Sequence, residues 1–298
     1  MTEFEFLLLD RITKIKSINN LYNLNDNSYI SFSGGKDSLV MSYLIDLSIP
    51  NNSIPRVFVD TGIEFNLLRK FVKKLAEKDS RIKIIYPKKN ISVMLKEKGY
   101  PFKSKEHSQI VGTYQKLGDK SIYAQSYLNG KRFIQCPQKL RYQFSPNFKL
   151  KISDKCCFEL KKEPCENFSK ENKKTISIVG IRKAEGGRRR NVKGCTVFND
   201  KDCTELKKFF PLLPCDNNFI ESFIKEFKIS LCELYYPPYN LRRTGCKGCP
   251  YSPDIQKQLD MMSLYLPNER KQCELIWQPV YSEYRRIGYR LHDENLLF

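Results

Sequence analysis

Ser33-Gly34-Gly35-Lys36-Asp37-Ser38 is the stretch that decides the fold. It follows an apolar run at 29–32 and precedes a helix-like run at 39–45. A strand, a glycine turn and a helix start suit a bound phosphate, because glycine lets the backbone approach an anion and the first N–H groups of the helix point at it. The serines add hydroxyl donors, Lys36 adds a cation, and Asp37 offers a carboxylate to Mg²⁺. The sequence therefore predicts a phosphate-binding loop; the alternative is an ordinary glycine turn before a helix.

Strands and helices alternate around this loop. We expect strands at 28–32, 55–59, 82–86 and 176–179, and helices at 3–18, 39–45, 66–78, 91–98, 217–228, 254–264 and 268–287. Such alternation is typical of an α/β fold with a doubly wound, mostly parallel sheet, in which ligands lie at the carboxyl ends of the strands. Asp60, Thr61 and Gly62 directly follow the second strand.

The rest of the chain is less regular. Residues 186–205 are polar and basic and are expected to form a loop. Near Pro211 and Pro214 we place a boundary between a nucleotide-binding domain, residues 1–215, and a helical C-terminal region, residues 216–298.

Charge and composition restrict the classes of partner. Lysine and arginine number 52 against 33 aspartate and glutamate, a net charge of +19. This excess favours an anionic partner such as a nucleic acid, although a general richness in lysine would give the same balance. The sequence holds no apolar stretch of about 18 residues, and its first 20 residues mix acids and lysines, unlike a signal peptide. We expect a cytoplasmic protein that does not enter membranes.

The cysteines form one distinctive constellation. Cys156 and Cys157 are adjacent, and Cys246 and Cys249 form a CxxC pair. Four thiolates are enough for one [4Fe–4S] cluster or one zinc site, and spacing alone does not decide between them. The other cysteines are expected to be ordinary small residues: Cys136, Cys165, Cys195, Cys203, Cys215, Cys232 and Cys273. Of these, Cys195 and Cys203 lie in the basic loop, where exposure beside arginines would make a thiol reactive.

Together these stretches resemble a known family. The chain is similar to the phosphoadenosine phosphosulfate reductase-like proteins of the adenine nucleotide α-hydrolase superfamily, which includes the PP-loop ATP pyrophosphatases. The matching stretches, in order, are SGGKDS at 33–38, VDTGIEF at 59–65, YPFKSKEH at 100–107, KISDKCCFELKKEP at 151–164, VGIRKAEGGRRR at 179–190 and RRTGCKGCPY at 242–251.

The resemblance implies a parallel sheet of about five strands with a nucleotide at its switch point. It implies that residues 33–38 grip the phosphates, that the segment 60–62 lies near the ribose or adenine, and that Gly180 and Arg182 close over the nucleotide. Lys36, Asp37 and Arg182 are the expected catalytic residues. Lys105 and Arg188 are further contacts for the anion, or else solvated surface charges.

The same resemblance assigns the cysteines. It implies that Cys156, Cys157, Cys246 and Cys249 ligate a [4Fe–4S] cluster, and it makes zinc the less favoured metal. With four cysteine ligands, a structural role is the safer interpretation of the cluster.

Two departures from the reductases shape the expected function. The reductases attack sulfate sulfur with a cysteine in a C-terminal Glu-Cys-Gly-Leu-His tail, whereas no cysteine follows Cys273 here. A lysine in the loop is also typical of relatives that cleave ATP. We therefore expect an ATP- and Mg²⁺-dependent enzyme that releases pyrophosphate and transfers sulfur to a tRNA base or to DNA as phosphorothioate. The sulfur donor would be a partner such as a cysteine desulfurase.

Two other functions stay open from the sequence. One is a phosphoadenosine or adenosine phosphosulfate reductase in which Cys273 or Cys195 is a relocated nucleophile and thioredoxin the reductant. The other is a non-catalytic nucleotide or iron–sulfur sensor. The run 281–290, which interleaves tyrosines and arginines, predicts either a surface that stacks on bases or a packed helix with its tyrosines inward.

Overall fold

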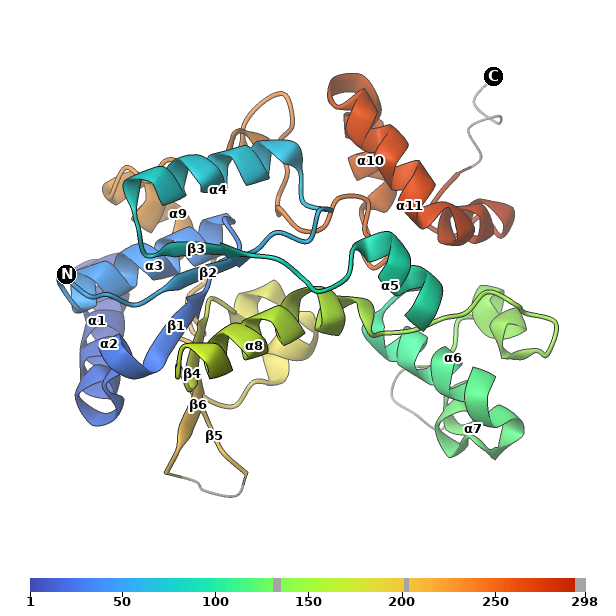
Figure 1. The fold of residues 1–298 in the computed structure, drawn as a ribbon, viewed down its shortest axis with the longest axis horizontal. Helices are drawn as coiled ribbons and strands as arrows, with labels where there is room; N and C mark the ends of the chain where they lie inside the picture. The colour runs from blue at the N-terminus through green and yellow to red at the C-terminus, as the bar shows by residue number, and fades with distance from the viewer. Residues whose placement is uncertain (131–134, 201–203, 293–298) are drawn as a thin grey trace. The chain divides into compact units, whose positions relative to one another are not determined.

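The computed structural model describes residues 1–130, 135–200 and 204–292 (Figure 1). By their contacts the described residues divide into two compact units. Unit 1 comprises residues 1–60, 66–86 and 164–244, and unit 2 comprises residues 61–65, 87–163 and 245–298. Each unit is therefore made of segments that alternate along the chain. The domain boundary expected at residue 215 stays a prediction. No helix in the described part of the chain is long and apolar enough to cross a bilayer.

Unit 1 is built on a mostly parallel sheet. In the described residues its strand order is β3-β2-β1-β4-β6-β5, and every neighbouring pair is parallel except β5 and β6. The bounds are β1 Ser28–Ser31, β2 Arg56–Val59, β3 Ile82–Ile85, β4 Ile176–Val179, β5 Thr196–Phe198 and β6 Leu206–Phe209. The order reverses between β1 and β4, whose register pairs Ile30 with Ile178. The expected doubly wound α/β fold is therefore confirmed, and this reversal is its topological switch point.

Helices cover the sheet of unit 1. Their bounds are α1 Glu3–Tyr22, α2 Leu24–Asn27, α3 Lys36–Ser48, α4 Asn66–Lys78, α8 Glu163–Glu171 and α9 Asn217–Glu226. Helices α1, α3 and α9 pack on one another. On one sheet face, Tyr29, Val57 and Val59 form a cluster with Cys165 and Phe168 of α8. Right-handed crossovers put α3 and α4 on the face opposite the helix that returns the chain to β4.

The segment 186–205 corrects one expectation. It was expected to be a loop, but it contains 3-10 turns and β5, which pairs antiparallel with β6. Three residues at a sheet edge are too few to show the alternation by which a strand is recognised in sequence. The resemblance implied about five strands; β5 is added to the five parallel ones in the described chain.

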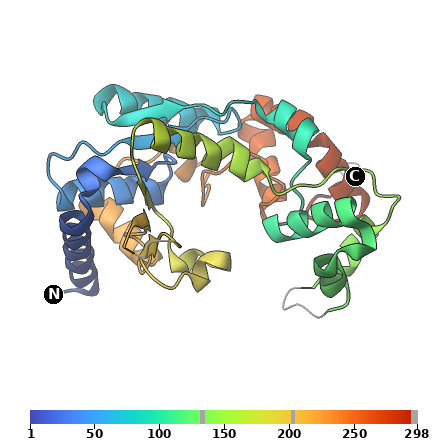
Figure 2. The same cartoon turned by 60° about the horizontal axis from the view of Figure 1, so that its bottom comes forward.

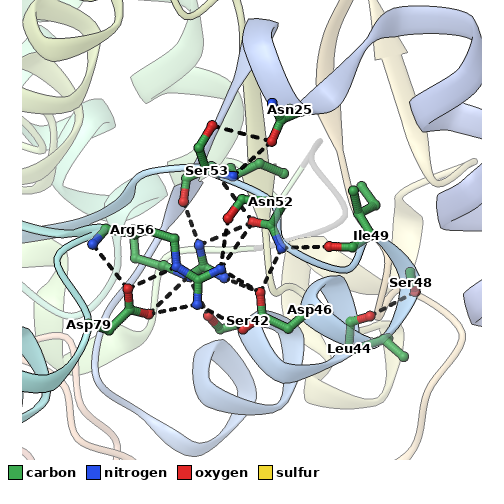
Figure 3. Close-up of polar contacts among 12 residues, drawn as sticks. Asn25, Ser42, Leu44, Asp46, Ser48, Ile49, Asn52, Ser53, Arg56 and Asp79 are labelled. Atoms are coloured by element: carbon green, nitrogen blue, oxygen red, sulfur yellow. Dashed lines mark hydrogen bonds and ion pairs between the residues drawn. The ribbon is translucent and has the colours of Figure 1, made fainter.

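A buried arginine ties the amino ends of β2 and β3 to α3. Arg56 is 1% exposed, and its guanidinium donates to Ser42 Oγ at 3.0 Å, to Ile54 O at 2.6 Å and to Asp46 (Figure 3). It donates to Asn52 Oδ1 as well, at 3.2 Å. A charge can be buried at this position because acceptors surround it.

Unit 2 is helical in its regular parts. The bounds are α5 Ile91–Lys98, α6 Lys105–Leu117, α7 Ile122–Leu128, α10 Ile255–Tyr265 and α11 Pro267–Arg286. Helices α6 and α7 lie side by side (Figure 2), and α10 packs on α11. Tyr281 and Tyr284 of α11 are fully buried, so the prediction that the run 281–290 forms a base-stacking surface is wrong for these two tyrosines. The packed helix with inward tyrosines is the arrangement observed.

A neutral histidine lies inside unit 2. His107 is 1% exposed; its Nδ1 lies 3.0 Å from Tyr127 Oη and its Nε2 2.7 Å from Gln143 Oε1. Burial lowers the pKa of His107 to about 4. The positive charges of Lys103 and Arg290 also lower this pKa, whereas the hydrogen bond to Gln143 raises it. The folded protein therefore resists protonation of this ring.

We predict that Arg56→Met lowers the free energy of unfolding by about 2–3 kcal/mol, because it leaves buried acceptors without their donor. The matched control is Arg81→Met. Arg81 shares Asp46 and Asp79 with Arg56 but its side chain is 27% exposed, so we expect a loss of about 1 kcal/mol or less. Urea unfolding of the full chain measures both values, and equal losses would contradict the assigned role of burial.

We also predict an acid-dependent loss of stability from His107. The unfolded chain takes up a proton near pH 6.5 that the folded chain refuses until about pH 4, so stability falls as pH drops through this window. The full effect is about 3 kcal/mol for a shift of this size. The measurement is the change in unfolding free energy between pH 7 and pH 4, made for the wild type and for His107→Gln. Because carboxylates titrate in both proteins, the difference between the two changes is the contribution of His107. Parallel pH profiles for the two proteins would refute it.

Candidate functional site

The glycine loop lies between β1 and α3 in unit 1, at the carboxyl edge of the sheet. Gly34 has φ +68°, and a Cβ there would lie 2.6 Å from Val72 Cγ2 and 3.0 Å from Leu68 Cδ1 of α4. A Cβ on Gly35 would lie 3.0 Å from Thr244 Oγ1 and 3.1 Å from Tyr235 Oη. Gly34 is therefore favoured by both close approach and backbone conformation, whereas at Gly35 a Cβ would be tight against two hydroxyls.

Hydrogen bonds hold the loop in a compact turn. Ser38 Oγ donates to Gly35 O at 2.9 Å and accepts from Ser33 N–H at 3.2 Å. Gly35 is the N-cap of α3 and has no side chain to satisfy the first N–H groups of the helix. The Lys36 N–H donates to Tyr235 Oη at 3.0 Å. The start of α3 thus has the backbone arrangement that favours an anion, with a tyrosine hydroxyl beside it.

Arg182 joins the two sides of the switch point. Its Nε donates to Asp37 Oδ1 at 2.9 Å, while its Nη1 donates to Cys215 O at 3.4 Å and its Nη2 to Asn217 Oδ1 at 3.0 Å. Arg182 is 3% exposed. Expected as a phosphate ligand, it fixes the Asp37 carboxylate at the first turn of α3. Gly180 also lies against the first turn of α3, since a Cβ on it would be 3.3 Å from Asp37 O.

The segment after β2 is divided between the units. Asp60 ends its part of unit 1 and forms an ion pair with Arg69 Nη2 at 2.8 Å. Thr61 and Gly62 belong to unit 2, where Thr61 N–H donates to Glu64 Oε2 at 2.9 Å. Within unit 1 the structure therefore brings together the loop, Gly180 and Arg182, and places Asp60 at the carboxyl end of β2. Thr61 and Gly62 lie with the cysteine-bearing unit.

Sequence reasoning missed three residues of this site. Tyr235 and Thr244 share a hydrogen bond of 3.1 Å between their hydroxyls and lie directly against Gly35. Arg69 pairs with Asp60 from α4. Thr244 falls within the stretch 242–251 that carries the resemblance, but no feature of the sequence shows that it returns to a loop about 200 residues earlier.

The four expected metal ligands all lie in unit 2. Cys156 is buried, and Cys157, Cys246 and Cys249 are partly buried. The negative charges of the Cys157, Cys246 and Cys249 thiolates each raise the pKa of Cys156. The four thiols therefore interact electrostatically. A β-bridge places Cys246 opposite Glu64.

Protonation differs among these thiols. The hydrogen bond between Cys156 and Cys157 raises the pKa of Cys156 and lowers that of Cys157. Lys105 and Lys161 add to the lowering at Cys157. Burial raises the pKa of Cys246 and of Cys249. Lys105, expected to contact the nucleotide, thus acts electrostatically on a cysteine of unit 2.

Helix α11 fixes the CxxC turn. Trp277 Nε1 donates to Lys247 O at 3.3 Å, and the Tyr281 hydroxyl donates to Gly248 O. Gly248 has φ +59°, and a Cβ there would lie 2.4 Å from Tyr281 Oη. Lys247 Nζ forms a buried ion pair with Glu269 Oε2 at 2.9 Å.

The donor set fits a thiophilic metal in kind. Four thiols from two segments gather in one unit, with the lysine charges of Lys105 and Lys161 to offset thiolates. Among residues 1–130, 135–200 and 204–292, no three His, Cys, Asp or Glu side chains are positioned to hold a metal ion. The four thiols are thus of the right chemical kind for a thiophilic metal. In the described residues, however, their side chains are not arranged as a ligand set.

Other cysteines bear on the alternative nucleophiles. Cys273 is fully buried, and burial raises its pKa to about 12, so its thiol is protected from substrate and largely protonated at neutral pH. Cys195 is partly exposed and accepts a hydrogen bond from Arg11 Nη1 at 3.5 Å. Cys203 lies outside the described residues.

Comparison with solved structures gives three relatives of low sequence identity. The phosphoadenylyl-sulfate reductase of Candida auris in its phosphate complex is 16% identical, covers 74% of this chain and 82% of its own, and has a TM-score of 0.43. The FMN adenylyltransferase of Candida glabrata with FMN and an ATP analogue is 17% identical, with coverage of 79% and 63% and a TM-score of 0.43. The NH3-dependent NAD synthetase of Campylobacter jejuni is 12% identical, with coverage of 95% and 96% and a TM-score of 0.41.

The sequence comparisons give a curated relative and a family. An uncharacterized protein of Methanocaldococcus jannaschii is 37% identical over 103 residues, which are 32% of this chain. The alignment spans only a quarter of that relative's length. The sequence model of the phosphoadenosine phosphosulfate reductase domain matches residues 27–141 and 123–252, well over half of the chain. The chain therefore belongs to the phosphoadenosine phosphosulfate reductase domain family.

Proposed function

We propose that this protein binds ATP at the loop 33–38, transfers AMP to an acceptor with release of pyrophosphate, and then replaces AMP with sulfur. The observation that carries the proposal is the start of α3. There two glycines expose the backbone, Lys36 and Asp37 occupy the first turn, and Arg182 fixes Asp37 from across the switch point. This arrangement suits an anion with several phosphates.

The adenylation step follows from that arrangement. A nucleophilic oxygen of the acceptor attacks the α-phosphorus, the bond from that phosphorus to the bridging oxygen breaks, and pyrophosphate leaves. A sulfide-level sulfur nucleophile then attacks the activated atom of the acceptor, and AMP leaves with the electron pair of the broken bond. Positioning and neutralisation of charge are what the protein supplies in such reactions.

The residues have distinct roles in this proposal. Lys36 neutralises charge on the phosphate oxygens, and the hydroxyls of Ser33 and Ser38 orient them. Asp37, held by Arg182, would hold Mg²⁺, which would offset the charge of the departing pyrophosphate. The Tyr235 hydroxyl, beside the Lys36 N–H, contacts the anion that binds there.

We include a [4Fe–4S] cluster in the proposal. Cys156, Cys157, Cys246 and Cys249 would hold it, and with four cysteine ligands it would be structural. The donor set and the nearby lysines support this assignment. No step of the adenylation passes through it.

Phosphosulfate reduction is the second candidate, because the matching family model carries that name. The burial of Cys273 disfavours it as the nucleophile, which leaves Cys195 for that role. Calorimetric titration of anaerobically purified protein with Mg-ATP and with phosphoadenosine phosphosulfate separates the two functions. Tight binding of ATP alone supports adenylation, and tight binding of the phosphosulfate alone supports reduction.

We predict that Lys36→Ala weakens Mg-ATP binding at least tenfold, because a cation is lost beside the phosphates. Lys73→Ala is the matched control, since Lys73 is an exposed lysine on α4, and it should bind ATP as the wild type does. Calorimetry measures both affinities. An unchanged affinity in Lys36→Ala would refute the proposed site.

We predict that Cys156→Ala and Cys246→Ala each lose most of the bound iron and the visible absorption of the cluster. Cys165→Ala is the control, because Cys165 packs against the sheet of unit 1 and is no expected ligand. Iron, zinc and acid-labile sulfide are measured per chain. Zinc without sulfide in the wild type, or full iron in both variants, would count against a [4Fe–4S] cluster.

A further inference from the structure

Two segments next to the glycine loop are strongly basic. Residues 183–193 and 236–244 of unit 1 carry seven basic side chains and a single acidic one, Glu185. All seven are at least partly exposed. We call this set the basic rim; its members are Lys183, Arg188, Arg189, Arg190, Lys193, Arg242 and Arg243.

Glu185 joins the two segments. Its side chain is 8% exposed, and Oε1 pairs with Arg189 Nη1 at 2.7 Å and with Arg243 Nη2 at 3.2 Å. Its Oε2 accepts the Arg182 N–H at 3.2 Å. One nearly buried carboxylate thus gathers two arginines whose side chains stay 40% and 58% exposed. Glu185 is the one acidic residue of the two segments, so most of the seven positive charges have no carboxylate partner within them and attract an anion.

Both segments adjoin the loop through their neighbours in sequence. Arg182, directly before Lys183, donates to Asp37. Thr244, directly after Arg243, lies against Gly35. A polymer bound along the basic rim therefore passes beside the place where the phosphates of ATP would bind.

An exposed aromatic ring accompanies these charges. Tyr236 is 47% exposed and follows Tyr235, whose hydroxyl accepts the Lys36 N–H. Cations that track a backbone, together with an exposed ring, are the features that bind single-stranded nucleic acid. Five of the seven cations are arginines, whose planar fork pairs with phosphate oxygens through two hydrogen bonds. An acidic peptide offers no base for the ring, so nucleic acid is the better fit.

We infer that the basic rim is the binding surface for a single-stranded segment of nucleic acid, with Tyr236 stacked on a base. The inference rests on the proposed function for the identity of the chemistry at the loop, since the strand would present the acceptor atom there. The surface itself is argued from the charges and contacts of the rim alone.

The test uses the full chain and a fluorescein-labelled single-stranded 20-mer, in DNA and RNA forms, titrated by anisotropy at several KCl concentrations. Arg190→Gln with Arg242→Gln should weaken binding at least fivefold and lower the magnitude of the salt slope by about 1.4, because two phosphate contacts are lost. Tyr236→Ala should weaken binding at least fivefold with the slope unchanged, because stacking releases no counterions.

The charge-matched control is Lys78→Gln with Lys170→Gln. Both lysines are exposed. Lys78 precedes β3 and Lys170 precedes β4, so they lie toward the amino ends of the strands, whereas the glycine loop lies at the carboxyl ends. The control should bind the 20-mer as the wild type does. The inference would be overturned if control and rim variants lost affinity equally, or if the rim variant bound the 20-mer as the wild type does. It would also be overturned if polyglutamate competed with the labelled strand as effectively as the unlabelled 20-mer does.

The same rim variant separates this inference from the proposed function. Arg190 and Arg242 lie outside the loop 33–38 and have no role in the proposed ATP site, so Mg-ATP affinity should equal that of the wild type. Oligonucleotide binding that depends on the rim, in a protein that does not bind ATP, would support the surface and refute the proposed chemistry. ATP binding without oligonucleotide binding would do the reverse.

Discussion

The close approach of the chain to Gly34 and Gly35 is the constraint on which the candidate site depends. A Cβ on Gly34 would lie within 2.6 Å of a side chain of α4, and one on Gly35 would lie 3.0 and 3.1 Å from two hydroxyls. A larger residue at position 34 would force a side chain of α4 to shift, and one at position 35 would crowd Tyr235 and Thr244. The glycines therefore serve packing as well as anion access, and the loop, α4 and that segment are specified together.

Buried charges organise both edges of the sheet in unit 1. Arg56 holds the amino ends of β2 and β3 against α3, and Arg182 holds the carboxyl end of β4 against the first turn of the same helix. In each case a guanidinium with several donors joins segments distant in sequence. Directional bonds of this kind fix position more strictly than apolar contact does, which a phosphate site requires.

Much of the fold could be predicted because its signals are local. The glycine loop lies between an apolar strand and a helix, and the four named strands coincide with β1 to β4. Short edge pairing is not local, so β5 escaped prediction. The sequence predicts the loop part of the candidate site. It does not predict Tyr235, Thr244 and Arg69, because these residues join the site through tertiary contacts that leave no periodic pattern in the sequence. The tyrosines of α11 had two interpretations in sequence, and only burial distinguishes surface from core.

The hydrogen bonds from α11 to the CxxC turn affect how unit 2 depends on a metal for its fold. In a zinc finger the metal organises the chain, and removing it unfolds the domain. Here Trp277 and Tyr281 bond to the carbonyls of Lys247 and Gly248, and Lys247 is paired inside the protein with Glu269. The turn is thus preorganised by aromatic side chains and an ion pair. The proposed cluster would therefore load into a folded apoprotein, and a chelator that removed it would leave unit 2 folded.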